Sequence, residues 1–167
     1  MMRTLDTERL VLRQFEARDL DAYAAMSADA EVMRYIGQGG PIGRDAAWGQ
    51  LAFFLGHWAL RGYGMWALEL RASGRLIGRA GFINPEGWPG LELGWLLARD
   101  AWGCGYAAEA CAAALATRRA QFGTQELISL IRPANSRSIA LAERLGASFA
   151  REIDFRGEPA RVYVHAA

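Results

Sequence analysis

The stretch LELGWLLARDAWGCGYAAEACAAALATRRAQF, residues 91–122, decides the fold of this chain. Residues 91–97 alternate large apolar side chains with Glu92 and a glycine, as a β-strand does. After a short polar link, Gly103 and Gly105 lead into a run rich in alanine, the best helix former. The stretch therefore predicts a strand, a glycine turn and a helix, in that order.

The glycine turn is a candidate anion site. Unpaired N–H groups and the positive end of the helix dipole coincide at a helix start, and the glycines leave this backbone uncovered. Two glycines also ease a tight turn that binds nothing. The spacing Gly103-x-Gly105-x-x-Ala108 matches the dinucleotide fingerprint, yet Arg132 stands where that motif has an acidic residue. Only one further strand–helix pair follows, so the pattern disfavours a dinucleotide site.

Length and composition are typical of one globular domain, predicted over residues 1–167 with a core of about 5–165. A net charge of +1 argues against nucleic acid as a partner. No apolar run approaches the roughly 18 residues of a membrane span, so no membrane partner is expected. Cys104 and Cys111 lie about 10 Å apart on the predicted helix, too far for a disulfide, and lack metal-ligand spacing. We therefore expect a cytoplasmic protein without a metal.

The rest of the chain predicts a mixed sheet. Strands are expected at 10–15, 63–71, 75–83, 91–97, 127–131, 149–155 and 160–164, and helices at 20–26, 45–60, 106–122 and 136–145. Strands 63–71, 75–83 and 91–97 form an antiparallel meander. Strand 127–131 returns parallel to 91–97 through a right-handed crossover. The pattern gives six to seven strands and about four helices.

Residues 102–107, WGCGYA, resemble the pyrophosphate loop of the GNAT superfamily, the acyl-CoA-dependent N-acyltransferases. That family writes the loop as Gln/Arg-x-x-Gly-x-Gly/Ala; Gly105 and Ala107 fit it, while Trp102 replaces the usual first residue. A tryptophan at this position resembles the loop of one branch of the family, the ribosomal-protein N-terminal (Rim-type) acetyltransferases. The same branch resembles this chain at TERLVLR (7–13), YAAEA (106–110) and NSRS (135–138). The likeness runs from about residue 5 to the last hairpin.

The resemblance implies an α/β (α+β) GNAT fold whose mostly antiparallel sheet splays between its fourth and fifth strands, 91–97 and 127–131. It implies acetyl-CoA as co-substrate. The backbone of Trp95, Leu96 and Leu97 would pair with the pantetheine arm. The pyrophosphate would lie on the N–H groups of Trp102, Gly103, Cys104, Gly105, Tyr106 and Ala107. Asn135 would reach the pantetheine and Arg137 the phosphates; a helix-capping Asn135 and a core Trp102 are the alternatives.

Amine attack on a thioester needs the neutral amine. At pH 7 deprotonation costs about 1.4 kcal/mol for an α-amino group and about 4.6 kcal/mol for a lysine. Glu92 is the candidate base, because strand alternation places it opposite Leu91 and Leu93, on the face that a substrate approaches. The alternative is a solvated glutamate at the sheet edge. Direct transfer in a ternary complex is expected, since no Ser/His/Asp set indicates a covalent intermediate.

The acid that protonates the leaving thiolate is less defined. In the family a tyrosine follows the asparagine by seven residues, and here that position is Ala142, so Ser138 is the candidate catalytic proton donor. The expected acceptor is a primary amine, either a peptide N-terminus or a small molecule. It would lie against the first two helices and the 37–43 loop, with Trp48, Tyr63 and Trp66 as wall residues. The two histidines, His57 and His165, carry no predicted role.

Two questions stay open at this point. A CoA-binding sensor or interaction module without turnover has the same sequence features, and the missing tyrosine favours it. Nothing in the sequence decides whether the chain forms a homodimer.

Overall fold

A computed structural model describes residues 4–166, which form one eight-stranded sheet in the order β1-β2-β3-β4-β5-β6-β8-β7. All neighbours are antiparallel except β5 and β6. The strands are β1 Leu5–Asp6, β2 Leu10–Arg13, β3 Met65–Leu70, β4 Leu76–Ile83, β5 Leu91–Leu97, β6 Leu127–Ile131, β7 Ala147–Phe155 and β8 Glu158–His165. The predicted mixed sheet and its parallel crossover are confirmed.

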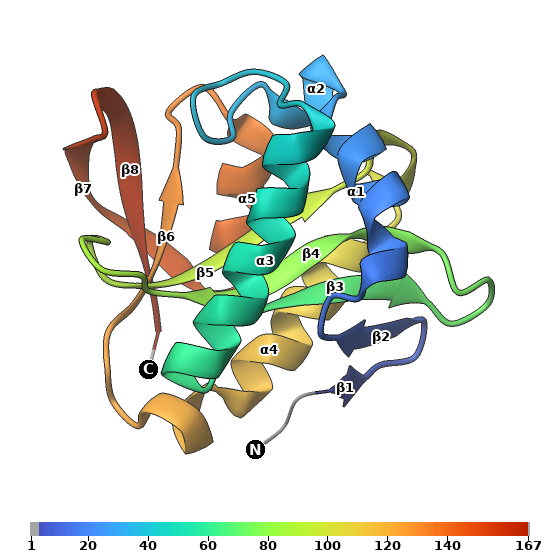
Figure 1. The fold of residues 1–167 in the computed structure, drawn as a ribbon. Coiled ribbons are helices and arrows are strands. Elements are labelled where there is room, and N and C mark those ends of the chain that lie inside the picture. Colours follow the sequence, from blue (N-terminus) through green and yellow to red (C-terminus); the bar gives the residue numbers. More distant parts are fainter. Residues whose placement is uncertain (1–3, 167) are drawn as a thin grey trace.

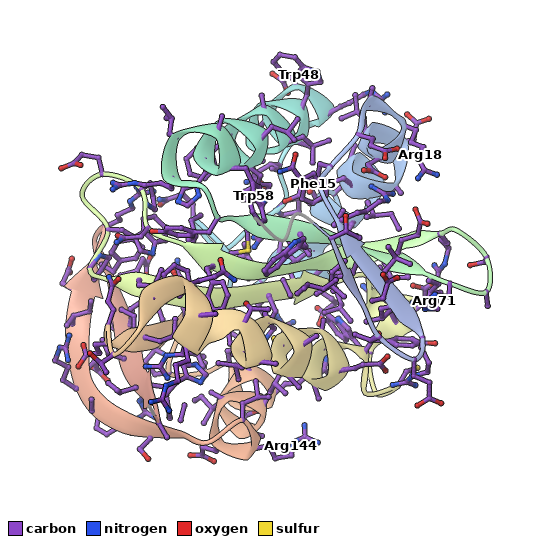
Figure 2. All side chains as sticks on the ribbon, turned by 90° about the horizontal axis from the view of Figure 1, so that it is seen from below. Phe15, Arg18, Trp48, Trp58, Arg71 and Arg144 are labelled. Atoms are coloured by element: carbon purple, nitrogen blue, oxygen red, sulfur yellow. The ribbon has the colours of Figure 1, made fainter. Side chains whose placement is uncertain are left out.

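Helices cover both faces of the sheet (Figures 1 and 2). Helices α1 and α3 lie together on one face, while α4 and α5 lie on the other. The five α-helices among the described residues are α1 Leu20–Ser27, α2 Ala30–Met33, α3 Arg44–Arg61, α4 Tyr106–Phe122 and α5 Ser136–Arg144. Two short 3-10 turns, Ala17–Asp19 and Arg99–Ala101, precede α1 and the glycine turn.

The alanine-rich sequence of α4 lets this helix approach the sheet closely. Ala110, Cys111 and Ala114 are fully buried against a core that contains Trp66 and Phe82. Small side chains on the buried stripe leave room for the large aromatic residues of β3 and β4. The strand–turn–helix unit of residues 91–122 is thus the centre of the fold, as its pattern predicts.

Glu109 fixes the start of α4 to the N-terminal segment. Its carboxylate accepts hydrogen bonds from Thr7 Oγ1 at 2.6 Å, Arg9 N at 2.9 Å and Arg9 Nε at 2.7 Å. Arg9 Nη1 continues to the carbonyl of Cys104 at 2.9 Å, inside the glycine turn. The side chains of Thr7 and Arg9 therefore help to set the shape of the turn from the opposite end of the sequence.

The structure corrects the predicted number of strands, the end of the strand expected at 10–15 and the number of helices. The count of six to seven strands is too low, because a short strand that was not predicted, β1, precedes β2 and pairs with it. β2 ends at Arg13, whose guanidinium forms a buried ion pair with Asp19 at 2.8 Å. A fifth helix, α2, forms a single turn capped by Asp29, which accepts from the N–H groups of Glu31 and Val32. The last strand, β8, lies between β6 and β7.

Candidate active site

Strands β5 and β6 pair only at their first residues. Leu91 is opposite Leu127 and Glu92 opposite Ile128, and no later pair forms among the described residues. Figure 1 shows β6 and the β7–β8 hairpin turning away from β5. The predicted splay is confirmed, and a gap opens beside the second half of β5.

The main chain of Trp95 lies at this gap. On its two sides, Leu93 O accepts a hydrogen bond from Ser129 Oγ at 2.7 Å and Leu97 O accepts from Trp102 Nε1 at 3.0 Å. Alternate residues of a strand direct their N–H and C=O groups to the same neighbour. We therefore expect the N–H and C=O of Trp95 to face the gap, where an extended ligand could pair with them as an added strand does.

The glycine turn closes the far end of the gap. Gly103 and Gly105 have φ values of 73° and 81°, a left-handed conformation that favours glycine. A Cβ at Gly103 would meet nothing within 4 Å, so the outer surface of the turn is open. The first N–H groups of α4 have no intrahelical acceptor and face a positive dipole end. The turn therefore fits a diphosphate bound by backbone donors.

Three more of the predicted residues meet around the gap. The guanidinium of Arg137 lies 3.9 Å from the ring centroid of Trp102, at the glycine-turn end. Asn135 caps α5, its Oδ1 accepting from Ser138 N at 3.3 Å. Trp95 Nε1 donates to Ser138 Oγ at 3.3 Å, which joins β5 to α5 across the gap. The capping geometry of Asn135 is thus present, and its proposed contact with a ligand stays a prediction.

Glu92 is buried beside a cavity of about 690 Å³ that Trp95, Asn135 and Ser138 also line. Its Oε2 accepts from Trp88 Nε1 at 2.6 Å and its Oε1 from Leu130 N at 3.3 Å. Burial raises the pKa of Glu92 to about 7, against the opposing effects of these two hydrogen bonds and of the positive charge of Arg79. The solvated edge glutamate is therefore excluded. A carboxyl group with this pKa exchanges protons readily near neutral pH.

Ser129 and His165 brace the point where the strands part. Because the Ser129 hydroxyl donates to Leu93 O, His165 Nε2, at 2.8 Å from Ser129 Oγ, must donate to Ser129. His165 is 3 % exposed, and burial lowers its pKa to about 4, so it is neutral at pH 7. His165 is therefore part of the site's support, a role that its place near the end of the sequence did not indicate.

We expect Ser129→Ala to lower the free energy of unfolding by about 1–3 kcal/mol, because it leaves Leu93 O and His165 Nε2 without partners in a buried place. For a chain of this size the Tm should fall by roughly 2–10 °C. Differential scanning calorimetry measures it. Ser148→Ala, on exposed β7, is the control and should leave the Tm unchanged within about 1 °C. Equal shifts in both variants would contradict the bracing role.

The expected wall of the acceptor site is wrong. Trp48 is 61 % exposed and points away from the sheet (Figure 2). Trp66 is fully buried in the core, and Tyr63 packs edge-on against Phe122 at 4.8 Å. The cavity is lined instead by side chains that the sequence did not indicate, among them Tyr35, Gln50, Phe53, Phe54, Arg79 and Trp88. The 37–43 loop does reach the cavity, through Gly37 and Gln38.

His57 is a packed core residue and does not line the cavity. Its Nδ1 lies 2.8 Å from Tyr63 O and its Nε2 accepts from Asn84 N at 3.0 Å, which fixes the tautomer with the proton on Nδ1. Within residues 4–166, no three His, Cys, Asp or Glu side chains lie close enough together to bind a metal. No helix of that part of the chain is long and apolar enough to cross a membrane.

Comparison with known proteins agrees with this geometry. The family model of the acetyltransferase (GNAT) domain matches residues 9–148. The chain is 31 % identical to the Bacillus subtilis protein YkkB, over 95 % of this chain and 93 % of YkkB. It is 33 % identical to a solved acetyltransferase from Agrobacterium tumefaciens, which it matches with a TM-score of 0.87 over 100 % of this chain and 96 % of that one.

The chain therefore belongs to the GNAT family, whose members are acetyl-CoA-dependent N-acetyltransferases. A further solved structure, the RimL ribosomal L7/L12 alpha-N-protein acetyltransferase in complex with coenzyme A, is 15 % identical. It covers 97 % of each chain with a TM-score of 0.79, and at this identity the likeness shows a common fold.

Proposed function

We propose that this protein transfers the acetyl group of acetyl-CoA to a primary amine held in the 690 Å³ cavity, with Glu92 as the base. The observation that carries the proposal is the place of Glu92. It is buried at the point where β5 and β6 part, between the cavity and the gap, and its pKa is about 7. Such a group can accept the proton that the amine must lose.

The other residues of the site bind and orient. Acetyl-CoA supplies an activated acetyl thioester. The N–H groups of residues 102–107 hold its diphosphate, with Arg137 beside them. The main chain of Trp95 pairs with its extended arm, whereas Leu96 is paired with Arg79 of β4 and Leu97 O already accepts from Trp102 Nε1. Asn135 reaches that arm from the start of α5. The roles of these residues rest on the gap, the open turn and the positions of the side chains around them.

Ser138 is the proposed proton donor to the departing sulfur. Its hydroxyl accepts from Trp95 Nε1, so its own hydrogen is free to point into the cavity that it lines. A hydroxyl is a weak acid, and a thiolate with a pKa near 8.5 leaves tolerably without one. We therefore expect Glu92, as the base, to contribute more to the rate than Ser138.

Several finer expectations accompany the proposal as predictions. They are a Rim-type peptide N-terminus as one acceptor class, a cytoplasmic location, a single domain over 1–167, and no metal or nucleic acid in the reaction. The homodimer stays an open question. A non-catalytic CoA-binding module is the rival proposal.

The test measures thiol release from acetyl-CoA in the presence of small primary amines and of short peptides with free N-termini. The proposal expects amine-dependent release of free CoA, with the acetylated amine seen by mass spectrometry. Binding of acetyl-CoA without acetylation of any amine would favour the rival. Gln121→Ala, on the opposite end of α4 from the glycine turn, serves as a control and should react at the wild-type rate.

A further inference from the structure

One half-buried arginine of the cavity, Arg79, has no acidic partner within salt-bridge distance among the described residues. Arg79, on β4, is half-buried and lines the cavity. Among the described residues, no carboxylate lies within salt-bridge distance of its guanidinium, and the polar partner of its Nη1 is Met65 Sδ at 4.0 Å. The other two cavity arginines differ. Arg132 pairs with Glu158 at 2.9 Å. Arg156 also has no acidic partner among the described residues, but it is exposed to solvent above the ring of Trp88.

Arg79 is nevertheless held in position. Its Nε donates to Tyr23 Oη at 3.2 Å, and Tyr23, which is fully buried, donates to Gln50 Oε1 at 2.7 Å. Its guanidinium lies 5.1 Å from the ring centroid of Phe54, which also lines the cavity. A chain of side chains that orients a cation without neutralising it is typical of a binding site for an anion.

Arg79 and Glu92 share one face of the sheet. Ile83 pairs with Glu92, Gly81 with Gly94, and Arg79 with Leu96, and paired residues point to the same side. The two charged groups thus stand about 13 Å apart along the strands at their Cα atoms, closer at their side-chain ends. Glycines lie between them, and the side chain of Met65 covers Gly94, which gives an apolar floor.

We propose that the acceptor is an amino acid or another amine that carries a carboxylate, and that Arg79 binds this carboxylate while the amine lies at Glu92. The inference rests on the proposed function and narrows its acceptor. The apolar floor and Phe54 contact the part of the acceptor that joins its two charged ends. Arg79 is in this account the residue that determines specificity.

The experiment compares kcat/KM for carboxylate acceptors with kcat/KM for their neutral primary amides. The acceptors are leucine, methionine and 6-aminohexanoate, and each is compared with its own amide. The set varies the distance from amine to carboxylate. Amidation of an α-amino acid lowers the pKa of its amine and by itself favours the amide. A preference for the carboxylate therefore reports on binding of the acid group.

We expect the wild type to prefer at least one carboxylate by about 10- to 100-fold, as for a charge-assisted hydrogen-bonded pair. In Arg79→Met this ratio should fall to about 1 for 6-aminohexanoate and below 1 for the two α-amino acids, whose amides have the lower amine pKa. In Arg79→Lys it should keep an intermediate value, because the charge stays while the forked geometry is lost. Arg151→Met, exposed on β7, is the control and should keep the wild-type ratio.

The carboxylate-to-amide ratio of kcat/KM distinguishes a failure of this inference from a failure of the proposed function. A wild type that acetylates amides and carboxylates equally well overturns the inference and leaves the proposed function standing. So does an Arg79→Met variant that loses both acceptors equally, which would mean that Arg79 acts on Glu92 and not on the acceptor. Absence of transfer to every amine, carboxylate or peptide would instead contradict the proposed function itself.

Discussion

Replacement of Glu92 by glutamine should lower kcat/KM at pH 7 by about 10²- to 10⁴-fold, the usual contribution of a positioned base. Glutamine keeps the shape of the side chain and can accept from Trp88, but it cannot take a proton. In the wild type kcat/KM should rise with pH up to about 7, since the carboxylate form is the active one. In the variant this inflection should be absent, so a pH–rate profile of both proteins is the measurement.

The same variant should gain stability where it loses activity. In the wild type the pKa of Glu92 is near 7 when folded and near 4.5 when unfolded, so the folded state holds the extra proton between these values. Stability therefore falls as pH rises through this window, by about 3 kcal/mol in total. Glu92→Gln removes this dependence. In urea unfolding at pH 4.5, 6 and 8, the free energy of unfolding of the variant relative to that of the wild type should increase at each higher pH.

The two results together exclude a purely structural effect. A variant that merely disturbed the site would lose stability at all pH values along with activity. Asp154→Asn, an exposed acidic residue of β7, is the matched control, and it should change neither the pH–rate profile nor the pH dependence of stability. Full activity of Glu92→Gln at pH 7 would remove Glu92 from the mechanism.

At the glycine turn, Gly105→Asp should weaken acetyl-CoA binding by more than about 100-fold, whereas Gly105→Asn should weaken it by less than about 10-fold. Both residues tolerate the left-handed φ of 81° at this position, and they have nearly the same shape. The aspartate adds a negative charge beside the turn, where its Cβ would lie 3.4 Å from Arg9 Nη2, and this charge repels a diphosphate bound to the N–H groups. Isothermal titration calorimetry with acetyl-CoA measures the two affinities.

Salt supplies the internal check for this pair. The difference between Asp and Asn is electrostatic in origin, and it should shrink as ionic strength rises from 0.05 to about 0.5 M. The same substitutions at Gly62, which has a φ of 77° and a ψ of 3° at the end of α3, should leave acetyl-CoA affinity unchanged. Equal affinities for Gly105→Asp and Gly105→Asn would show that the phosphates do not lie on this turn.

The central unit could be predicted from the sequence because its signals are local. Strand alternation in 91–97, the paired glycines and the alanine-rich run each act over a few residues, and the observed β5 and α4 follow them. The prediction that the sheet splays between β5 and β6 rested on the family resemblance. The burial of Glu92 could not be predicted, since it depends on Trp88 from a loop and Leu130 from β6.

The difference between local signals and properties of the whole fold also explains why the acceptor-site residues were predicted wrongly. In α3, Trp48 is separated from Leu55 by seven residues and both are exposed, while Leu51, Phe54 and Trp58 form the buried stripe. The residue types alone did not separate these two faces. The lack of an acidic partner for Arg79 is a property of the whole fold. The absence of a partner can be recognised only when the positions of the carboxylates around Arg79 are known.

The most direct test of the account is a titration of isotopically labelled protein with coenzyme A, followed by backbone amide NMR. We expect the amides of Trp95 and of residues 102–107 to show the largest shifts and to become protected from hydrogen exchange, while amides of the outer β7 strand stay unchanged. Binding of coenzyme A that leaves the Trp95 and 102–107 amides unperturbed would contradict the account.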